Sequence, residues 1–170
     1  EGSPNASPVG ISALALEPDF TTDSITYSLD DDASGRFSID PVSGIVSLAN
    51  TSLIDFETAS SHSIAVRASS SDGSFSSAPY SISVIDINDT APSVDPASLL
   101  VPEFSPLGAP VGLLTASDPD TVGSLQNWAI TGGSGASVFA IDPATGLISV
   151  ADPAPLDILP NPPFVIHVPV

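Results

Sequence analysis

Apolar and polar residues alternate along several short segments of this chain. The alternation is clear in residues 24–30 (SITYSLD), 44–49 (GIVSLA), 62–68 (HSIAVRA) and 80–86 (YSISVID). A period of two places the apolar side chains of an extended segment on one face, as in a half-buried β-strand. Clusters of Asp, Gly, Pro and Ser separate these segments at spacings of roughly 8–12 residues, which is typical of an antiparallel sandwich. The pattern predicts an all-β fold.

The first half of the chain is predicted to hold six strands and a short leading strand at its N-terminus. The six strands are expected near residues 9–16, 24–30, 36–40, 44–49, 61–69 and 78–87. The 18 prolines and 12 glycines leave no window for a long amphipathic helix. The sequences DPVSG, from Asp40, and DPATG, from Asp142, are predicted to be turns. Pro presets φ in such a turn, and Gly takes the position that needs a positive φ.

A long internal repeat divides the chain. Residues 40–49 (DPVSGIVSLA) recur as residues 142–151 (DPATGLISVA), an offset of 142 − 40 = 102 residues. The same offset relates Glu1 to Glu103, Phe37 to Phe139 and Val66 to Val168. We therefore predict two copies of one domain. The first copy covers residues 1–91, a linker covers 92–101, and an incomplete second copy covers 102–170.

The second copy is expected to lack its last strand. Its final segment, FVIHVPV, corresponds to residues 62–68 of the first copy, which continues into the strand YSISVID. Without that strand, backbone groups and part of the core would be exposed. We favour truncation of a longer polypeptide, in keeping with a chain that opens at Glu1 without an initiator Met or a signal peptide. The alternative is strand donation by a neighbouring subunit.

The charge balance excludes several functions. The chain has 20 acidic residues against two basic ones, Arg36 and Arg67, which gives a net charge of −18. Nucleic acids and anionic membranes need clustered Lys and Arg, so we expect neither as a partner. There is no Cys, and no apolar run approaches the ~18 residues of a membrane span. The serines have no His and acid partners in a recognisable arrangement, so we expect no enzymatic activity.

Side-chain oxygens crowd together just past the middle of the chain. The stretch VIDINDTAP places Asp86, Asn88 and Asp89 within four positions. Further acids occur in the sequences IDFE, with Asp55 and Glu57, and ASDPD, with Asp118 and Asp120. Carboxylate, carboxamide and backbone oxygens are the ligands of Ca²⁺, which takes about six to eight of them. The sequence therefore indicates a calcium-binding cluster.

Five motifs, in order and partly duplicated, make the chain resemble a tandem pair of cadherin repeats of the bacterial cadherin-like kind. DINDTAP is similar to the D-x-N-D-N-x-P linker of that family, with Thr90 in place of the second Asn. IDFE is similar to L-D-x-E, ASDPD to A-x-D-x-D, VPEFSP to the opening P-E motif, and FSIDPVSGIVS to F-x-I-D-x-x-T-G. The resemblance implies tandem seven-stranded Greek-key (immunoglobulin-like) sandwiches, the second without its last strand.

The resemblance also implies up to three Ca²⁺ ions at the inter-repeat linker. The metal set is Glu1, Asp55, Glu57, Asp86, the carbonyl of Ile87, Asn88, Asp89, the carbonyl of Thr90, Asp118 and Asp120. Glu1, Asp55, Glu57 and Asp89 would surround the innermost ion. Glu1, Glu57, Ile87, Asp89 and Asp120 would hold the second. Asn88, Thr90, Asp118 and Asp120 would hold the third.

These expectations lead to one main hypothesis on function and one alternative. The main one is an extracellular, calcium-rigidified structural or adhesive repeat segment of a longer cell-surface protein or filament. Its partners would be neighbouring repeats or identical subunits, and possible surface or glycan ligands. The alternative is an accessory spacer or carbohydrate-binding sandwich of a secreted glycan-active enzyme, which an exposed aromatic patch around Trp128 would favour. Asn5, Asn50 and Asn88 also match the N-glycosylation pattern.

Overall fold

The chain forms two compact units in the computed structural model, which describes residues 1–16, 24–157 and 163–169. Unit 1 comprises Glu1–Ile87 and unit 2 comprises Asn88–Val170. Strands are the main regular elements of both units, and the helical elements among the described residues are the short 3-10 helices η1 (Thr51–Leu53) and η2 (Ala154–Asp157). The prediction of an all-β fold is confirmed. Over the described ranges, no helix has the length and apolar character needed to cross a membrane.

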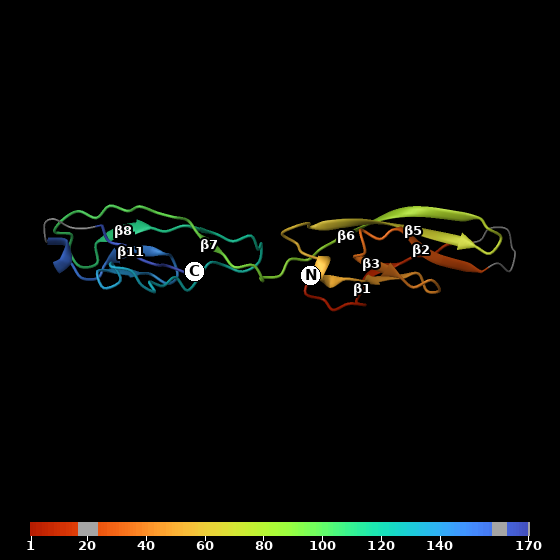
Figure 1. Cartoon of the computed structure of the whole chain (residues 1–170), viewed down its shortest axis with the longest axis horizontal. Coiled ribbons are helices and arrows are strands. Elements are labelled where there is room, and N and C mark those ends of the chain that lie inside the picture. Colours follow the sequence, from red (N-terminus) through yellow and green to blue (C-terminus); the bar gives the residue numbers. More distant parts are fainter. Residues whose placement is uncertain (17–23, 158–162, 170) are drawn as a thin grey trace. The chain divides into compact units, whose positions relative to one another are not determined.

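Unit 1 is built from two antiparallel three-stranded sheets (Figure 1). One sheet has the order β1-β4-β3 and the other the order β2-β5-β6. The strands are β1 (Pro8–Ser12), β2 (Ile25–Asp31), β3 (Phe37–Ile39), β4 (Ile45–Leu48), β5 (Ser61–Ser70) and β6 (Phe75–Ser83). Burial alternates along β1, β2 and β4, and the two sheets bury their apolar faces against each other.

The six strands predicted for the first half of the chain are all present, with boundaries that differ by a few residues. The predicted leading strand is wrong, because residues 1–4 form no strand and no ladder. Instead, the Glu1 side chain accepts hydrogen bonds from the backbone of two distant loops. A strand assignment based on alternation could not foresee that this carboxylate satisfies the backbone N–H groups of other segments.

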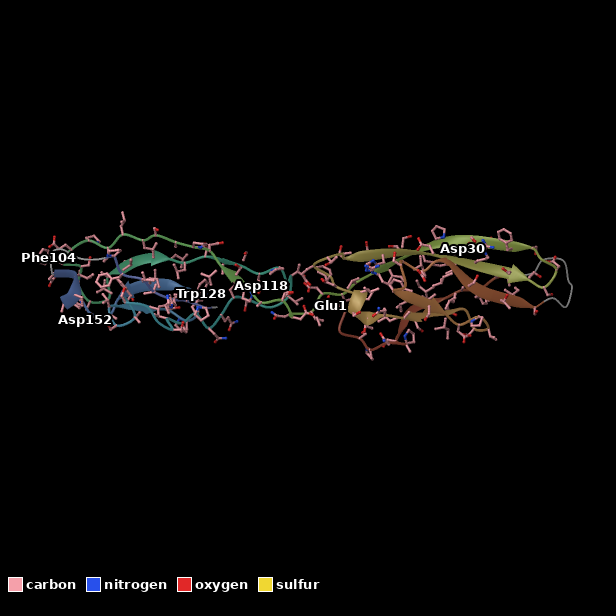
Figure 2. All side chains as sticks on the ribbon, viewed as in Figure 1. Glu1, Asp30, Phe104, Asp118, Trp128 and Asp152 are labelled. Carbon is pink, nitrogen blue, oxygen red and sulfur yellow. The ribbon has the colours of Figure 1, made fainter. Side chains whose placement is uncertain are left out.

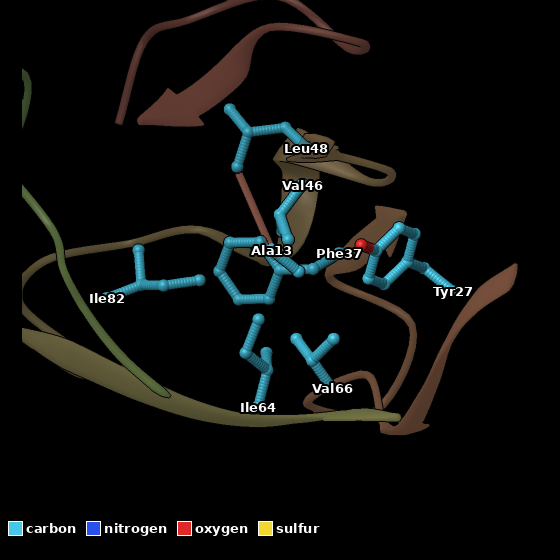
Figure 3. Packing of buried hydrophobic residues seen from close by; sticks show 8 residues of the cluster. All are labelled: Ala13, Tyr27, Phe37, Val46, Leu48, Ile64, Val66 and Ile82. Atoms are coloured by element: carbon cyan, nitrogen blue, oxygen red, sulfur yellow. The ribbon is translucent and has the colours of Figure 1, made fainter. Parts of the chain in front are cut away.

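Phe37 lies at the centre of the core of unit 1. Figure 3 shows its ring with Val46 and Leu48 of β4 on one side and Ile64 and Val66 of β5 on the other. Phe37 is only 3% exposed, and Ile82 of β6 belongs to the same buried cluster. The core therefore joins the two sheets through the Phe37 ring, with Tyr27 as a second aromatic member of a cluster that is otherwise aliphatic.

The two predicted DPxxG turns form as expected. The Asp40 carboxylate accepts hydrogen bonds from the backbone N–H groups of Val42 and Ser43 and from the Ser43 hydroxyl. Asp142 accepts the equivalent bonds from Ala144 and Thr145. The hydrogen bonds from Ser43 hold the pKa of Asp40 below its usual value, and the bond from the Ser43 backbone N–H has the largest effect. Both carboxylates therefore act as turn caps, as their spacing predicted.

Replacing Gly44 by Ala is expected to destabilise unit 1 by about 2 kcal/mol or more, the cost of a left-handed backbone with a side chain plus steric overlap. Gly44 has a φ of +68°, and an added Cβ would lie 2.6 Å from the Ala13 carbonyl oxygen. The matched control is Gly73→Ala, at a φ of +95° with no atom within 4 Å of the added Cβ. Urea unfolding of the two variants measures the difference. Equal losses would contradict the steric argument.

Unit 2 repeats part of this arrangement. Its strands are β7 (Ser93–Val94), β8 (Pro110–Leu113), β9 (Ala116–Ser117), β10 (Phe139–Ile141) and β11 (Leu147–Val150). The sheet β10-β11-β8 matches β3-β4-β1, and the pair Phe139–Val150 matches Phe37–Leu48 at the offset of 102 residues. β7, which lies in the predicted linker, pairs with β9. Leu114, Trp128, Phe139, Ile148 and Leu156 belong to the core of unit 2.

Candidate metal centres

Three carboxylates come together in unit 1. Glu1, Glu57 and Asp86 each offer one carboxylate oxygen, and these oxygens all lie within 4.8 Å of one another. Glu1 is far from the other two in sequence, and Glu57 follows η1 whereas Asp86 follows β6. Three negative groups at this spacing repel one another strongly unless a cation lies between them.

Two backbone hydrogen bonds hold Glu1, which is labelled in Figure 2, in this group. Its Oε2 accepts from the N–H of Phe56 at 2.7 Å, and its Oε1 accepts from the N–H of Ile87 at 3.0 Å. These bonds tie the carboxylate to both segments that carry the other two acids. The geometry of the group is therefore set by backbone donors, and each Glu1 oxygen keeps lone-pair capacity for a further partner.

Asp55 has a different role in the structure. Thr58 donates to both of its carboxylate oxygens, with the N–H at 3.0 Å from Oδ1 and the hydroxyl at 2.9 Å from Oδ2. The hydroxyl bond is the main reason that the pKa of Asp55 lies below its usual value. Asp55 caps the turn that presents Glu57, and it does not belong to the three-carboxylate group.

A second constellation lies within unit 2. The Asn88 amide donates to the carbonyl of Val122 at 3.2 Å, and the Thr90 N–H donates to Asp120 Oδ2 at 3.1 Å. The Asp120 N–H in turn donates to Asp118 Oδ1 at 3.2 Å. The structure thus links Thr90, Asp118 and Asp120, three of the four residues that the resemblance assigned to the third ion, whereas the fourth, Asn88, bonds to the backbone of Val122.

Asp120 is the most informative residue of this constellation. It is only 8% exposed, and its Oδ1 is a buried atom without a hydrogen-bond partner among the described residues. A buried carboxylate oxygen without a donor is costly, so such atoms call for an explanation such as a bound ion. One carboxylate oxygen of Asp89 lies within 4.8 Å of an Asp120 oxygen. This pair of acids in unit 2 therefore fits a cation.

The two arginines have other contacts. Arg36 donates to the carbonyls of Leu53 and Ala33, at 2.9 and 2.8 Å. Arg67 Nε lies 2.7 Å from Asp30 Oδ1, and its guanidinium stacks on the Phe75 ring at 4.3 Å from the centroid. The sequence contains no lysine. A hard cation with oxygen ligands is the chemistry that fits both acidic groups, because Ca²⁺ combines carboxylate, carboxamide and carbonyl oxygens.

Sequence reasoning missed the residues that shape the second constellation. Gly123 has a φ of +97°, and a Cβ there would overlap the Asn88 amide nitrogen. The carbonyl of Val122, which orients Asn88, belongs to the same turn. The sequence signal was the T-V-G stretch directly after Asp120, since a glycine in that position permits a close backbone approach.

Comparisons with known proteins give a consistent picture. No protein-family model matches the chain. Over 84% of the length of this chain, it is 31% identical to human cadherin-23. Over the same share of this chain, it is 32% identical to rat protocadherin Fat 2. The chain spans only 4% and 3% of the length of these relatives. The crystal structure of mouse cadherin-23 EC22-24 superposes with a TM-score of 0.57 at 28% identity, covering 76% of this chain and 42% of that one.

Proposed function

Because the chain belongs to the cadherin-repeat family, we propose that it is a calcium-binding structural and adhesive repeat segment of a longer cell-surface protein or filament. Relatives that share its sequence and its β-sandwich fold are extracellular cadherin repeats. The segment would act outside the cell without catalysing a reaction. Its partners would be neighbouring repeats or identical subunits.

The buried Oδ1 of Asp120 is the observation that carries the calcium proposal. Hydrogen bonds with Thr90 and Asp118 hold Asp120 in place, but its Oδ1 accepts no hydrogen bond from the described residues. The Glu1, Glu57 and Asp86 group supports the proposal independently. Ca²⁺ bound to either group would neutralise converging carboxylates in a chain with a net charge of −18 and thereby favour the folded state.

The number of ions is the finer part of the proposal. From the order of the motifs, we assign up to three Ca²⁺ ions to the residues around positions 86–90. Isothermal titration of the chelator-treated chain with Ca²⁺ measures this number. A stoichiometry of one to three with release by chelator is the expected result, whereas the absence of binding at millimolar Ca²⁺ would overturn the calcium proposal.

Replacing Glu57 or Asp89 by Ala is expected to lower Ca²⁺ affinity by about tenfold or more, because ligand charge and number set the affinity of such sites. Each variant removes a carboxylate that the resemblance assigns to two ions. The matched control, Asp40→Ala, removes a carboxylate that caps a turn. Calorimetric titration of the three variants tests the assignment. If Asp40→Ala lost as much affinity as the other two, the site residues would be wrong.

The glycan-binding alternative depends on an exposed aromatic platform. Trp128, the residue that would mark it, is buried in the core of unit 2 and packs against Gly146. Burial at this position favours the repeat-segment proposal, because a glycan platform needs an exposed ring face. Binding of the chain to a glycan array would revive the alternative.

A further inference from the structure

His62 is an ionisable residue on the inward face of the sandwich of unit 1. It is the second residue of β5, and alternation along this strand places its side chain on the same face as the buried Ile64 and Val66. The imidazole packs on the ring of Phe37, with 6.0 Å between the ring centroids and an angle of 60° between the ring planes. A titratable ring therefore contacts the residue at the centre of the core.

The Nε2 atom of His62 has no hydrogen-bond partner among the described residues, although it is buried from solvent. Burial is the main cause, and the charge of Arg36 the second, that the pKa of His62 lies below its usual value. A neutral imidazole tolerates this position at the cost of one unsatisfied nitrogen. Protonation would place an unpaired charge in the same position, which costs considerably more.

The internal repeat indicates what packing requires at this position. At the offset of 102 residues, His62 corresponds to Phe164, and Phe37 corresponds to Phe139. Phe164 and Phe139 pack edge to face in unit 2, with 5.6 Å between their ring centroids. An apolar ring therefore makes this contact in unit 2, whereas unit 1 makes it with an ionisable ring. What His62 adds over a phenylalanine is the capacity to bind a proton.

The sheet β1-β4-β3 presents no carboxylate to His62. Its three strands contain no titratable side chain. Arg36 directly precedes β3, and its guanidinium, which donates to the carbonyls of Leu53 and Ala33, is the charged group that acts on the imidazole. Because a positive neighbour repels a proton, this side of the sandwich favours the neutral form of His62.

The sheet β2-β5-β6 offers an imidazolium no compensating charge either. β6 pairs Ile82 with His62. The other titratable residues of the three strands are two phenols, two exposed acids and an arginine that pairs with one of these acids: Tyr27, Tyr80, Asp30, Asp31 and Arg67. The next acids along the chain, Glu57 and Asp86, lie five residues before His62 and four after Ile82. The causes of the pKa shift, burial and Arg36, include neither of them.

We propose that His62 makes unit 1 acid-sensitive, because protonation of the inward-facing imidazole loosens the packing of the two sheets around Phe37, whereas unit 2 has phenylalanine at this position. The sign follows from linkage. A histidine whose pKa is lowered by folding binds protons more readily in the unfolded chain. The stability of unit 1 is therefore complete well above about pH 6.5, and it decreases as the pH falls below that value towards the pKa of the folded state.

Urea unfolding of the full chain at pH 7.5 and pH 5.5, read for each unit by hydrogen exchange and mass spectrometry, tests the proposal at one free Ca²⁺ concentration. The parent chain is compared with His62→Phe, which introduces the residue of unit 2. The unfolding constant of unit 1 should rise between these pH values at least about threefold more in the parent. The upper limit is about tenfold, since an unfolded histidine is about 90% protonated at pH 5.5.

Two further variants keep the test decisive. His62→Gln is uncharged at both pH values and should lose the same pH dependence, even if an amide packs less well on Phe37 than a phenyl ring. His167→Gln removes the other histidine, which is exposed in unit 2, and should leave the pH dependence of unit 1 as in the parent. The proposal is overturned if both variants at position 62 keep the parental pH dependence, or if His167→Gln removes it.

An NMR titration of the parent chain measures the protonation of His62 directly. The midpoint of its imidazole signals, assigned with the His62→Gln variant, is expected below the value of about 6.5 for a freely exposed imidazole. A midpoint at or above that value would mean that the folded unit accepts the proton without cost, and it would overturn the proposal.

Discussion

Removing Ca²⁺ with a chelator is expected to lower the melting temperature of the chain by roughly 10–20 °C. The value follows from the linkage of binding to folding, which adds about 2.7 kcal/mol per site at a hundredfold excess of ligand over Kd. For units of this size, 1 kcal/mol corresponds to about 4–8 °C. The physical cause is the neutralisation of carboxylates, such as Glu57 and Asp120, that repel one another without a cation. Thermal melting with Ca²⁺ and with chelator measures the shift.

Two controls separate specific binding from general screening. Salt at matched ionic strength screens the net charge of −18 and should reproduce only a small part of the shift, because screening acts mainly between exposed charges. The variant with Glu57, Asp89 and Asp120 all replaced by Ala should show little dependence on Ca²⁺. Identical melting temperatures of the parent chain with Ca²⁺ and with chelator would contradict the calcium proposal.

Replacing Phe37 by Ala is expected to destabilise unit 1 by about 3–5 kcal/mol, the cost of deleting a buried aromatic ring and leaving a cavity. The ring is 3% exposed and contacts side chains from both sheets (Figure 3). Because domains are stable by only about 5–15 kcal/mol, this loss could unfold unit 1. Urea titration followed by hydrogen exchange and mass spectrometry reads peptides of unit 1 and unit 2 separately.

Phe75→Ala is the matched control for this prediction. Phe75 is 63% exposed, and the guanidinium of Arg67 stacks on its ring. Its removal should cost about 0.5–1 kcal/mol, the usual value of an exposed cation–π contact. The prediction fails if the two Phe→Ala variants destabilise unit 1 equally.

The candidate site was predictable in its residue types and only partly in its geometry. The motifs named Asn88, Thr90, Asp118 and Asp120 as one ligand group. The structure joins Thr90, Asp118 and Asp120 by hydrogen bonds, whereas Asn88 bonds to the carbonyl of Val122. Asp86 was part of the predicted metal set but was not assigned to any of the three individual ions. The structure places it beside Glu1 and Glu57. That these residues bind Ca²⁺ stays a prediction.

Asp55 illustrates why a motif alone is an incomplete guide. The resemblance placed Asp55 and Glu57 around the same ion, and side chains two residues apart point the same way when the backbone is extended. The segment instead forms a turn in which Thr58 donates to both Asp55 oxygens. A local hydrogen bond to the next residues competes with the extended backbone, and short polar side chains favour it.

The sequence by itself determined the all-β architecture, the strand positions of unit 1 and the two DPxxG turns. These features depend on local periodicity and turn chemistry, which the residues carry wherever they fold. Only the tertiary structure decided the conformation around Glu1 and the burial of Asp120 Oδ1. Both depend on contacts between residues tens of positions apart, and such contacts are set by how distant segments pack and share their backbone donors.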